Sequence, residues 1–233
     1  MRAALFAELQ PIEIPNCELQ RFGEPNDGGY LLCANLLASV KAGYSYGISG
    51  YDQWGCDVAR MLSVRVHQYD CFNLEKPRCA AGVTVFHAEC IGPARTVDDA
   101  GRIFDTFESQ FASNGDGAKR VVVKMDVEGA EWDTFLQTPS EVLERIDQLV
   151  VEFHGVDWER YLAAVRRLKE FFVVANLHIN NYACQAGLEP FPSSAYEVLF
   201  VHKRIAVAGG PRPPGPHPLD TPNKPDAPDC QLR

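Results

Sequence analysis

From Gly43 onward, short apolar runs alternate with amphipathic stretches along the chain. Short apolar runs bounded by turn residues are typical of buried β-strands, and longer amphipathic stretches are typical of α-helices. We expect strands at residues 44–48, 65–69, 83–88, 121–125, 148–153, 172–177 and 196–202, and helices at 52–62, 96–111, 130–136, 140–145 and 158–171. Because strands that alternate with helices need crossover connections, the sequence predicts an α/β fold with a mainly parallel sheet and helices on both faces.

The length of 233 residues suits one domain with a full hydrophobic core. Residues 1–35 begin with a short amphipathic stretch and continue into a turn-rich segment that leads to a short strand. Residues 209–233 are rich in proline and have few large apolar side chains, so they can form neither a helix nor a central strand. We therefore expect a single domain of residues 1–208, followed by a proline-rich tail, residues 209–233, that lies along the body or hangs free.

The charge balance bears on the class of partner. The formal net charge is −9 at pH 7, whereas proteins that bind nucleic acid carry clusters of Lys and Arg against the phosphates. The chain also has no apolar run of about 18 residues that would span a membrane, and residues 1–15 lack the pattern of a secretory signal. The sequence thus favours a small-molecule partner, no nucleic acid, no membrane and a cytoplasmic location.

Eight cysteines complicate the expected location. No C-x-x-C pair is present, which argues against a zinc site. We expect buried free thiols, which behave as small hydrophobic side chains. The alternative is a disulfide from Cys71 to Cys79 or to Cys90, and it would place the protein in an oxidising compartment such as the secretory lumen.

Ligands of open parallel sheets bind beyond the carboxyl ends of the strands. After the first expected strand, Gly47 and Gly50 allow a tight turn before a helix whose free amides attract negative charge. After the second, Asp70 follows about twenty residues later, which is the place of the acid that binds ribose hydroxyls in nucleotide-binding α/β folds. Together these residues predict a nucleotide-like cofactor.

Acidic, imidazole and amide side chains gather at the ends of the later strands. Side chains two residues apart on a strand share one face, and two carboxylates on one face repel each other unless a cation or donors lie between them. Such a cluster suits general acid/base chemistry or a hard divalent metal. Its residues are Asp126, Glu128, Glu152, His154, His178, Asn180 and Asn181, whereas Glu131 falls in the first turn of a helix, where the dipole favours an acid.

Several stretches resemble the FkbM-type S-adenosylmethionine-dependent methyltransferases and related methyltransferase-like domains. The matching pieces are NDGGYLL (26–32), YSYGISGYDQ (44–53), HQYD (67–70), VVVKMDVEGAEWDTF (121–135), VVEFHG (150–155) and YEVLFVHK (196–203). The resemblance implies a Rossmann-like class I methyltransferase fold with a seven-stranded, mostly parallel sheet. Its last strand, residues 196–202, would be antiparallel and lie beside the fifth.

The resemblance also implies roles for single residues. The first-strand loop would line the methionine part of S-adenosylmethionine, an acid would bind the ribose, and the 27–30 turn would close over the cofactor or substrate as part of an N-terminal cap. Gly47, Ser49 and Gly50 would line the methionine part, and Asp70 would bind the ribose. Asp27, Gly28, Gly29 and Tyr30 would form the closing turn, and Asp126 would lie near the amino group or sulfonium.

The expected reaction is O-methylation of a small-molecule or sugar hydroxyl. We expect His154 to take the proton of the hydroxyl, with His178 as second choice and Glu152 orienting the imidazole. A competing version places a divalent metal among Asp126, Glu152, His154 and His178. Two other classes stay open, namely a metal-dependent hydrolase that uses the same cluster and a non-catalytic nucleotide- or cofactor-binding module.

Overall fold

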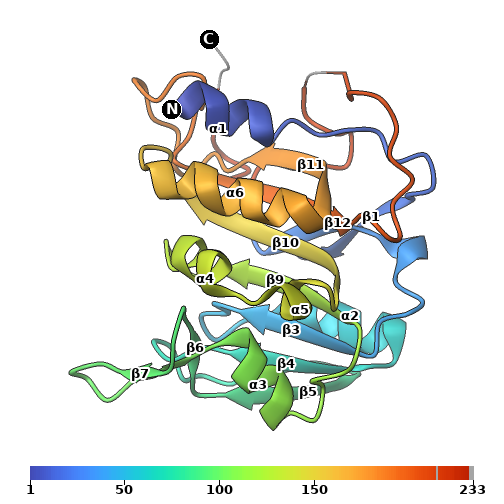
Figure 1. Cartoon of the computed structure of the whole chain (residues 1–233), viewed down its shortest axis with the longest axis vertical. Helices are drawn as coiled ribbons and strands as arrows, with labels where there is room; N and C mark the ends of the chain where they lie inside the picture. Colours follow the sequence, from blue (N-terminus) through green and yellow to red (C-terminus); the bar gives the residue numbers. More distant parts are fainter. Residues whose placement is uncertain (214, 231–233) are drawn as a thin grey trace.

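The computed structural model describes residues 1–213 and 215–230. Its centre is a seven-stranded, mostly parallel sheet in the order β11-β12-β10-β9-β3-β4-β5 (Figure 1). The strands are β3 (Ala42–Tyr46), β4 (Arg65–Tyr69), β5 (Val83–His87), β9 (Val121–Asp126), β10 (Ile146–His154), β11 (Phe172–Ile179) and β12 (Ala195–His202). These match the seven strands predicted from the apolar runs.

The last strand breaks the parallel pattern, as predicted. β12 lies between β10 and β11 and is antiparallel to both, whereas β5, β4, β3, β9 and β10 pair in parallel. The register places Glu152 opposite Asp126 on one side and Glu197 on the other. Acidic residues of three neighbouring strands therefore stand in one row near the carboxyl end of β9.

Successive residues of a strand belong in turn to two hydrophobic clusters. Val121, Val123 and Met125 of β9 belong to one cluster, and Val122 belongs to the other. The first cluster includes apolar residues of α4 (Glu131–Gln137), α5 (Ser140–Leu143) and α6 (Glu159–Phe171), and the second includes those of α2 (Gln53–Leu62) and of the hairpin formed by β1 (Leu19–Gly23) and β2 (Gly29–Cys33). The chain begins with α1 (Arg2–Glu8), and a 3-10 turn, Ala34–Leu36, follows β2.

The helix expected at residues 96–111 is wrong over its first half. β7 (Thr96–Val97) and β8 (Ile103–Asp105) pair in an antiparallel manner and, with β6 (Cys90–Ile91), form a small three-stranded sheet. Asp98 accepts hydrogen bonds from the amides of Ala100 and Arg102, and Gly101 has a φ of 78°, so the chain turns back instead of continuing as a helix. The helix α3 (Phe107–Ser113) begins after Thr106, whose side chain caps it.

The prediction of free thiols is also wrong, because all eight cysteines form disulfides. Of the two alternatives, the Cys71–Cys90 bond is present and the Cys71–Cys79 bond is not. Pairing depends on which strand ends meet in space, and the linear sequence does not reveal this. The other three bonds are Cys17–Cys33, Cys56–Cys79 and Cys184–Cys230.

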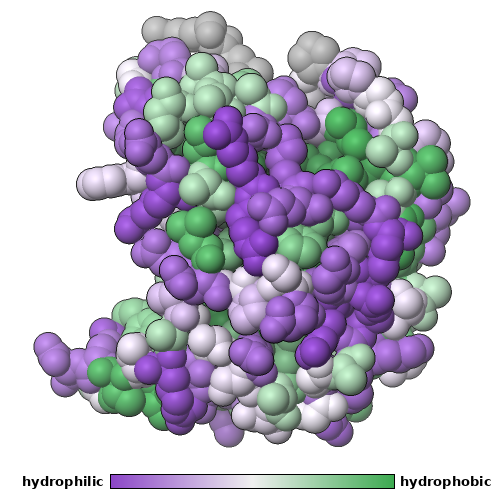
Figure 2. Space-filling model, in the orientation of Figure 1, coloured by the Kyte–Doolittle hydropathy of each residue, from purple (hydrophilic) through white to green (hydrophobic). Residues whose placement is uncertain are grey.

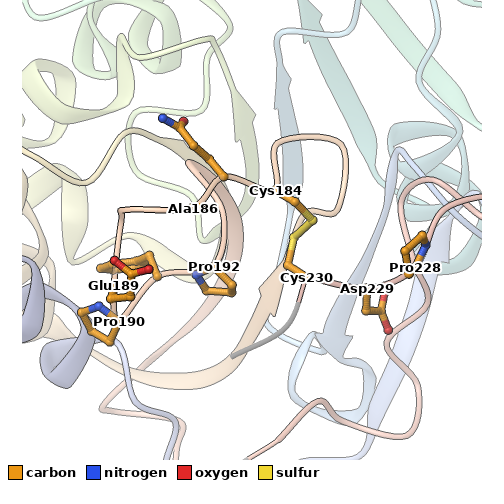
Figure 3. Close-up of a pocket in the computed structure, with 10 residues that line it drawn as sticks. Cys184, Ala186, Glu189, Pro190, Pro192, Pro228, Asp229 and Cys230 are labelled. Atoms are coloured by element: carbon orange, nitrogen blue, oxygen red, sulfur yellow. A yellow bond between two sulfur atoms is a disulfide. The ribbon is translucent and has the colours of Figure 1, made fainter. Parts of the chain in front are cut away.

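The proline-rich tail lies along the body over its described residues. Arg212 donates to the carbonyl of Ala175, and Lys224 donates its amide to the side chain of Asn181. The Cys184–Cys230 bond ties the end of this segment to the loop after β11, beside a cavity of about 320 Å³ (Figure 3). The prediction that this segment forms no helix and no central strand is confirmed for residues 209–213 and 215–230.

Among the described residues, no helix is both long enough and apolar enough to cross a membrane.

Candidate functional site

A cavity opens where the strand order of the main sheet changes direction. β3 is followed outward by β4 and β5, and β9 and β10 lie on its other side, so the crevice at the carboxyl ends of β3 and β9 is the expected ligand position. The cavity measures about 410 Å³, and Figure 2 shows the molecule hollowed at this edge, beside the projecting segment that carries β7. Its lining includes Tyr46, Gly47, Ser49, Tyr69, Asp70, Phe72, Cys90, Ile91, Phe104, Asp126, Val127, Glu128 and Ala130.

The turn after β3 brings main chain against the end of β9. Gly47 has a φ of 70°, and a Cβ atom there would lie 1.5 Å from the carbonyl oxygen of Asp126. Only glycine fits such a close approach of two main chains. Ser49 also has a positive φ, 47°, and its amide points to Asp70.

Asp70 is buried at the end of β4 and holds the neighbouring loops. Its Oδ2 accepts the amide of Ser49 at 2.7 Å, and its Oδ1 accepts the amides of Phe72 at 2.8 Å and Asn73 at 3.0 Å. A carboxylate offers about four lone-pair sites, so these three bonds leave it able to accept a further donor from the cavity. Asp70 thus links the turn after β3 to the loop after β4.

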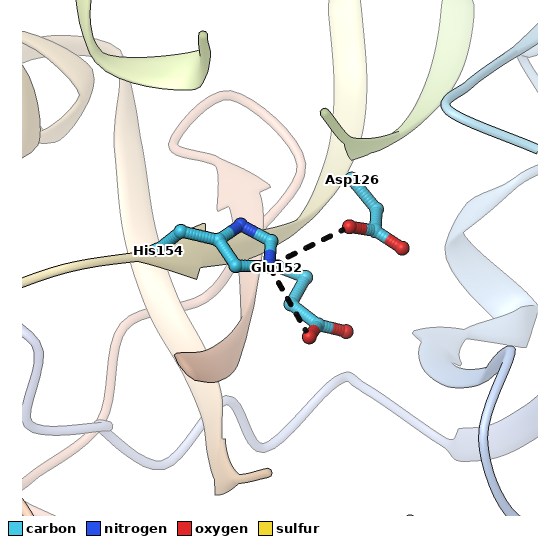
Figure 4. A group of neighbouring side chains, drawn as sticks. All are labelled: Asp126, Glu152 and His154. Carbon is cyan, nitrogen blue, oxygen red and sulfur yellow. Dashed lines mark ion pairs between the residues drawn. The ribbon is translucent and has the colours of Figure 1, made fainter. Parts of the chain in front are cut away.

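His154 stands at the end of β10 among four carboxylates. Its Nδ1 lies 3.1 Å from Oε1 of Glu131 in α4. Its Nε2 faces the other way and lies 3.9 Å from Asp126, 3.5 Å from Glu128 and 3.7 Å from Glu152. Figure 4 shows the imidazole, Asp126 and Glu152 turned toward one another.

Glu131 fixes which nitrogen of His154 faces these acids. The side chain of Glu131 is fully buried, and its Oε1 also accepts the amide of Val127 at 3.0 Å. Since a carboxylate only accepts hydrogen bonds, Nδ1 of His154 must donate, which leaves Nε2 for the cavity side. Burial opposes a charge on the imidazole, but the bond and attraction from Glu131, then attraction from Glu152 and Asp126, raise the pKa of His154 to about 9.

Glu152 is buried in the middle of the acidic row. Asn180 donates to its Oε1 at 2.7 Å, and the hydroxyl of Tyr30 lies 3.5 Å from its Oε2. Burial, followed by repulsion from Asp126 and Glu197, raises the pKa of Glu152 well above its ordinary value.

Lys124 supplies a positive charge on the other side of Asp126. Its Nζ lies 3.6 Å from Oδ2 of Asp126 and donates to the carbonyls of Tyr46 at 3.2 Å and Gly47 at 2.9 Å. Lys124 therefore joins the end of β3 to β9 and is held in place by main-chain acceptors.

The structure brings together part of the predicted set. Within the described residues, Asp126, Glu152 and His154 place one ligand atom each within 4.8 Å of one another, and His178 is not in that group. His178 lies instead 3.2 Å from Glu197. Burial opposes a charge on His178, but the hydrogen bond to Glu197 and the attraction from Glu197 and Asp220 together raise its pKa. Glu152 is near Nε2 of His154, so the group that orients the imidazole through Nδ1 is Glu131 rather than Glu152.

The predicted cofactor residues also divide, and they lie in three places. Gly47, Ser49, Asp70 and Asp126 line the cavity. Gly50 adjoins Asn73 instead. From the 27–30 turn, the hydroxyl of Tyr30 reaches Glu152 of the acidic row. Asn223 of the tail donates to both Asp27 and Glu197 and so links this turn to the row.

Sequence reasoning missed the roles of Glu131 and Lys124. Glu131 was expected only to favour a helix start, and it does lie in the first turn of α4. Its contact with His154 spans 23 residues, and a single sequence carries no sign of it. Lys124 lies between Val123 and Met125 in a buried strand, and a charged residue inside this apolar run is the signal that the sequence offers.

No protein-family model and no curated protein matches the sequence. Among solved structures, the chain is similar to the fibrillarin pre-rRNA processing protein of Methanococcus jannaschii, with 10% sequence identity and a TM-score of 0.38. The match covers 82% of this chain and 84% of that chain. A likeness this distant does not indicate an activity.

Proposed function

We propose that the chain is an S-adenosylmethionine-dependent methyltransferase that methylates an oxygen of a small molecule. The supporting observation is the cavity at the change of strand order, with Gly47, Asp70 and Asp126 on its walls. The proposal includes a class I methyltransferase fold with helices on both faces of the sheet and kinship with the FkbM-type enzymes.

The cavity suits a nucleoside with a charged amino-acid arm. Its volume of about 410 Å³ lies within the range of about 300–1,000 Å³ for small-molecule sites. Phe72, Ile91 and Phe104 give it an apolar wall for the adenine ring. Asp70 retains acceptor capacity for the ribose hydroxyls, and Asp126 offers a carboxylate to the amino group.

S-adenosylmethionine supplies a methyl group on a positively charged sulfur, which is already electrophilic. The task left to the protein is to align the acceptor with that methyl group and to exclude water. Because Asp126 lines the cavity and also faces His154 and Glu152, we place the acceptor hydroxyl at this corner. The neutral form of His154 takes the proton of the hydroxyl or, where a bound cation lowers the pKa of the hydroxyl, the proton leaves to solvent.

The four disulfides support an oxidising compartment as the working location. The formal net charge of −9 supports a small-molecule acceptor rather than a nucleic acid.

Calorimetric titration with S-adenosylmethionine and S-adenosylhomocysteine tests the proposal. We expect both to bind at one site, and Asp70→Ala to weaken binding at least tenfold, because a bond to a charged group contributes about 1.5–3 kcal/mol. Asp70→Asn keeps one acceptor for the loop amides and serves as a second variant should Asp70→Ala fold poorly. Asp133→Asn, a half-exposed acid of α4, is the matched control and should bind normally.

Three results would contradict the proposal. The first is that the wild-type chain binds neither compound, and then metal binding alone would favour the hydrolase alternative. The second is that both Asp70 variants bind with unchanged affinity, which would remove the ribose role. Binding without methyl transfer to any hydroxyl acceptor would favour the cofactor-binding module.

A further inference from the structure

We propose that Asp126, Glu152 and His154 bind one divalent cation next to the cofactor cavity. Asp126 ends β9 and Glu152 is its partner on β10 in the parallel register, with His154 two residues further on the same face. The three ligand atoms lie within 4.8 Å of one another (Figure 4). The site is built on two adjacent strands of the main sheet, so its geometry is set by the fold.

The spacing of the ligand atoms fits a small cation. A divalent ion about 2.1 Å from each ligand holds neighbouring ligands about 3.0 Å apart and opposite ligands about 4.2 Å apart. Nε2 of His154 lies 3.9 Å from Asp126 and 3.7 Å from Glu152. Each distance exceeds the separation of neighbouring ligands by less than about 1 Å, so the side chains would close by that amount around a bound cation.

Glu131 stands where a metal-binding histidine usually has its outer partner. It accepts the Nδ1 proton of His154 and is itself held by the amide of Val127. A carboxylate in this position fixes the tautomer, turns the other nitrogen toward the metal and raises its basicity. Glu131 is not a ligand, and it has no exposed surface through which it would serve another partner.

The side chains around His154 carry an excess of negative charge that a divalent cation would offset. Four carboxylates, those of Asp126, Glu128, Glu131 and Glu152, contact the imidazole within 4.0 Å. Lys124 is the cation that pairs with Asp126. In the metal-bound state, with His154 neutral and the four carboxylates ionised, Lys124 leaves an excess of three negative charges, and one divalent ion reduces this excess to one.

The ligand set points to Mn²⁺ or Mg²⁺. Carboxylate oxygens are preferred by Mg²⁺ and Mn²⁺, and imidazole is accepted by transition ions, so Mn²⁺ satisfies both kinds of ligand. The cation would lie beside Asp126, which also lines the cofactor cavity. Binding of the acceptor hydroxyl to this cation, with a lower hydroxyl pKa, rests on the proposed methyltransferase function, whereas binding of the cation does not.

Titration with Mn²⁺ tests the site without any cofactor or acceptor. The full chain is freed of metal with a chelator, and Mn²⁺ binding is followed by loss of the electron paramagnetic resonance signal of the free ion. We expect one equivalent to bind and Mg²⁺ to compete for it. Glu131→Gln should weaken binding about 10–100-fold, the usual effect of removing an outer partner.

Variants of the proposed ligands test whether these side chains bind the cation. His154→Ala and Glu152→Gln should each reduce Mn²⁺ affinity at least tenfold, and His154→Asn is the second variant should His154→Ala fold poorly. Asp133→Asn of the same helix as Glu131 is the control and should bind like the wild type. No binding by the wild type at millimolar Mn²⁺ overturns the proposal, and so does equal binding by both His154 variants.

The outcome is separable from that of the methyltransferase proposal. Mn²⁺ binding without S-adenosylmethionine binding would uphold the cation site and contradict the proposed function. S-adenosylmethionine binding without Mn²⁺ binding would contradict the cation site and leave neutral His154 as the acceptor of the hydroxyl proton.

Discussion

Glu131 contacts Nδ1 of His154 at 3.1 Å, and the next residue, Trp132, donates from Nε1 to the carbonyl of His154 at 2.8 Å. One end of α4 therefore holds both the side chain and the main chain of His154. The indole of Trp132 is stacked between Phe153 and Tyr161, with ring centroids 4.2 and 4.1 Å away. The direction of the imidazole thus follows from the packing of α4 against β10 and α6.

Replacement of Glu131 should destabilise the protein in a graded way. Glu131→Ala leaves the amide of Val127 and Nδ1 of His154 without their acceptor in a buried place, which costs about 2–4 kcal/mol of unfolding free energy. Glu131→Gln keeps an oxygen acceptor and should cost less than half as much. Urea unfolding measures both, and equal losses for the two variants would show that the hydrogen bonds to Glu131 do not matter.

The sequence could predict the main sheet because local signals agree with it. The buried strands β9 and β10 read as apolar runs, and the row of Asp126 and Glu152 follows from parallel strands ending at one edge. The meeting of these acids with His154 was therefore accessible from pattern alone. This row is the part of the site that depends least on long-range packing.

Other parts of the site depend on packing between distant segments. The burial of Glu131 against His154 needs the docking of α4 on β10, and no local pattern encodes that contact. The helix expected at residues 96–111 shows the same limit, because Thr96 and the acids after it look like a helix start. In the structure Asp98 folds its own turn and Thr106 caps the helix.

Gly47 should tolerate no side chain. Gly47→Ala places a Cβ atom 1.5 Å from the carbonyl oxygen of Asp126 at a φ of 70°, so the end of β9 must move. We expect a loss of more than about 3 kcal/mol of unfolding free energy and weaker cofactor binding. Gly101→Ala is the matched control, because Gly101 has a φ of 78° but no atom within 4 Å of the added carbon, and its loss should stay near 1 kcal/mol.

Acid should destabilise the fold through His67. His67 is buried between His87 and Asp116, and burial, only partly offset by Asp116, lowers its pKa to about 4. Because the folded pKa lies below the unfolded value of about 6.5, this stability is present above pH 6.5 and is lost as the pH falls toward 4.

The expected loss from His67 is up to about 3 kcal/mol between these pH values. Urea unfolding of the wild type and of His67→Gln at pH 7.5, 6 and 5 measures it. The variant should be less stable at pH 7.5 but show a flatter pH dependence. Parallel pH profiles would assign the acid sensitivity to other groups, such as His202, whose pKa burial also lowers to about 4.

The Cys184–Cys230 bond should govern local opening of the tail rather than global unfolding. Asn223 of the tail is buried and donates to Glu197, and the amide of Lys224 donates to Asn181. A Cys184→Ser/Cys230→Ser double variant removes the disulfide that closes a loop of 46 residues. We expect this loss to weaken the docking of the tail on the body by roughly 2–4 kcal/mol. Hydrogen exchange should then accelerate at Lys224 and leave β9 and β10 protected, because local openings cost less than global unfolding.

A Cys17→Ser/Cys33→Ser variant is the control and should not change exchange at Lys224. Equal acceleration in both variants would mean that the tail opens only when the whole domain unfolds.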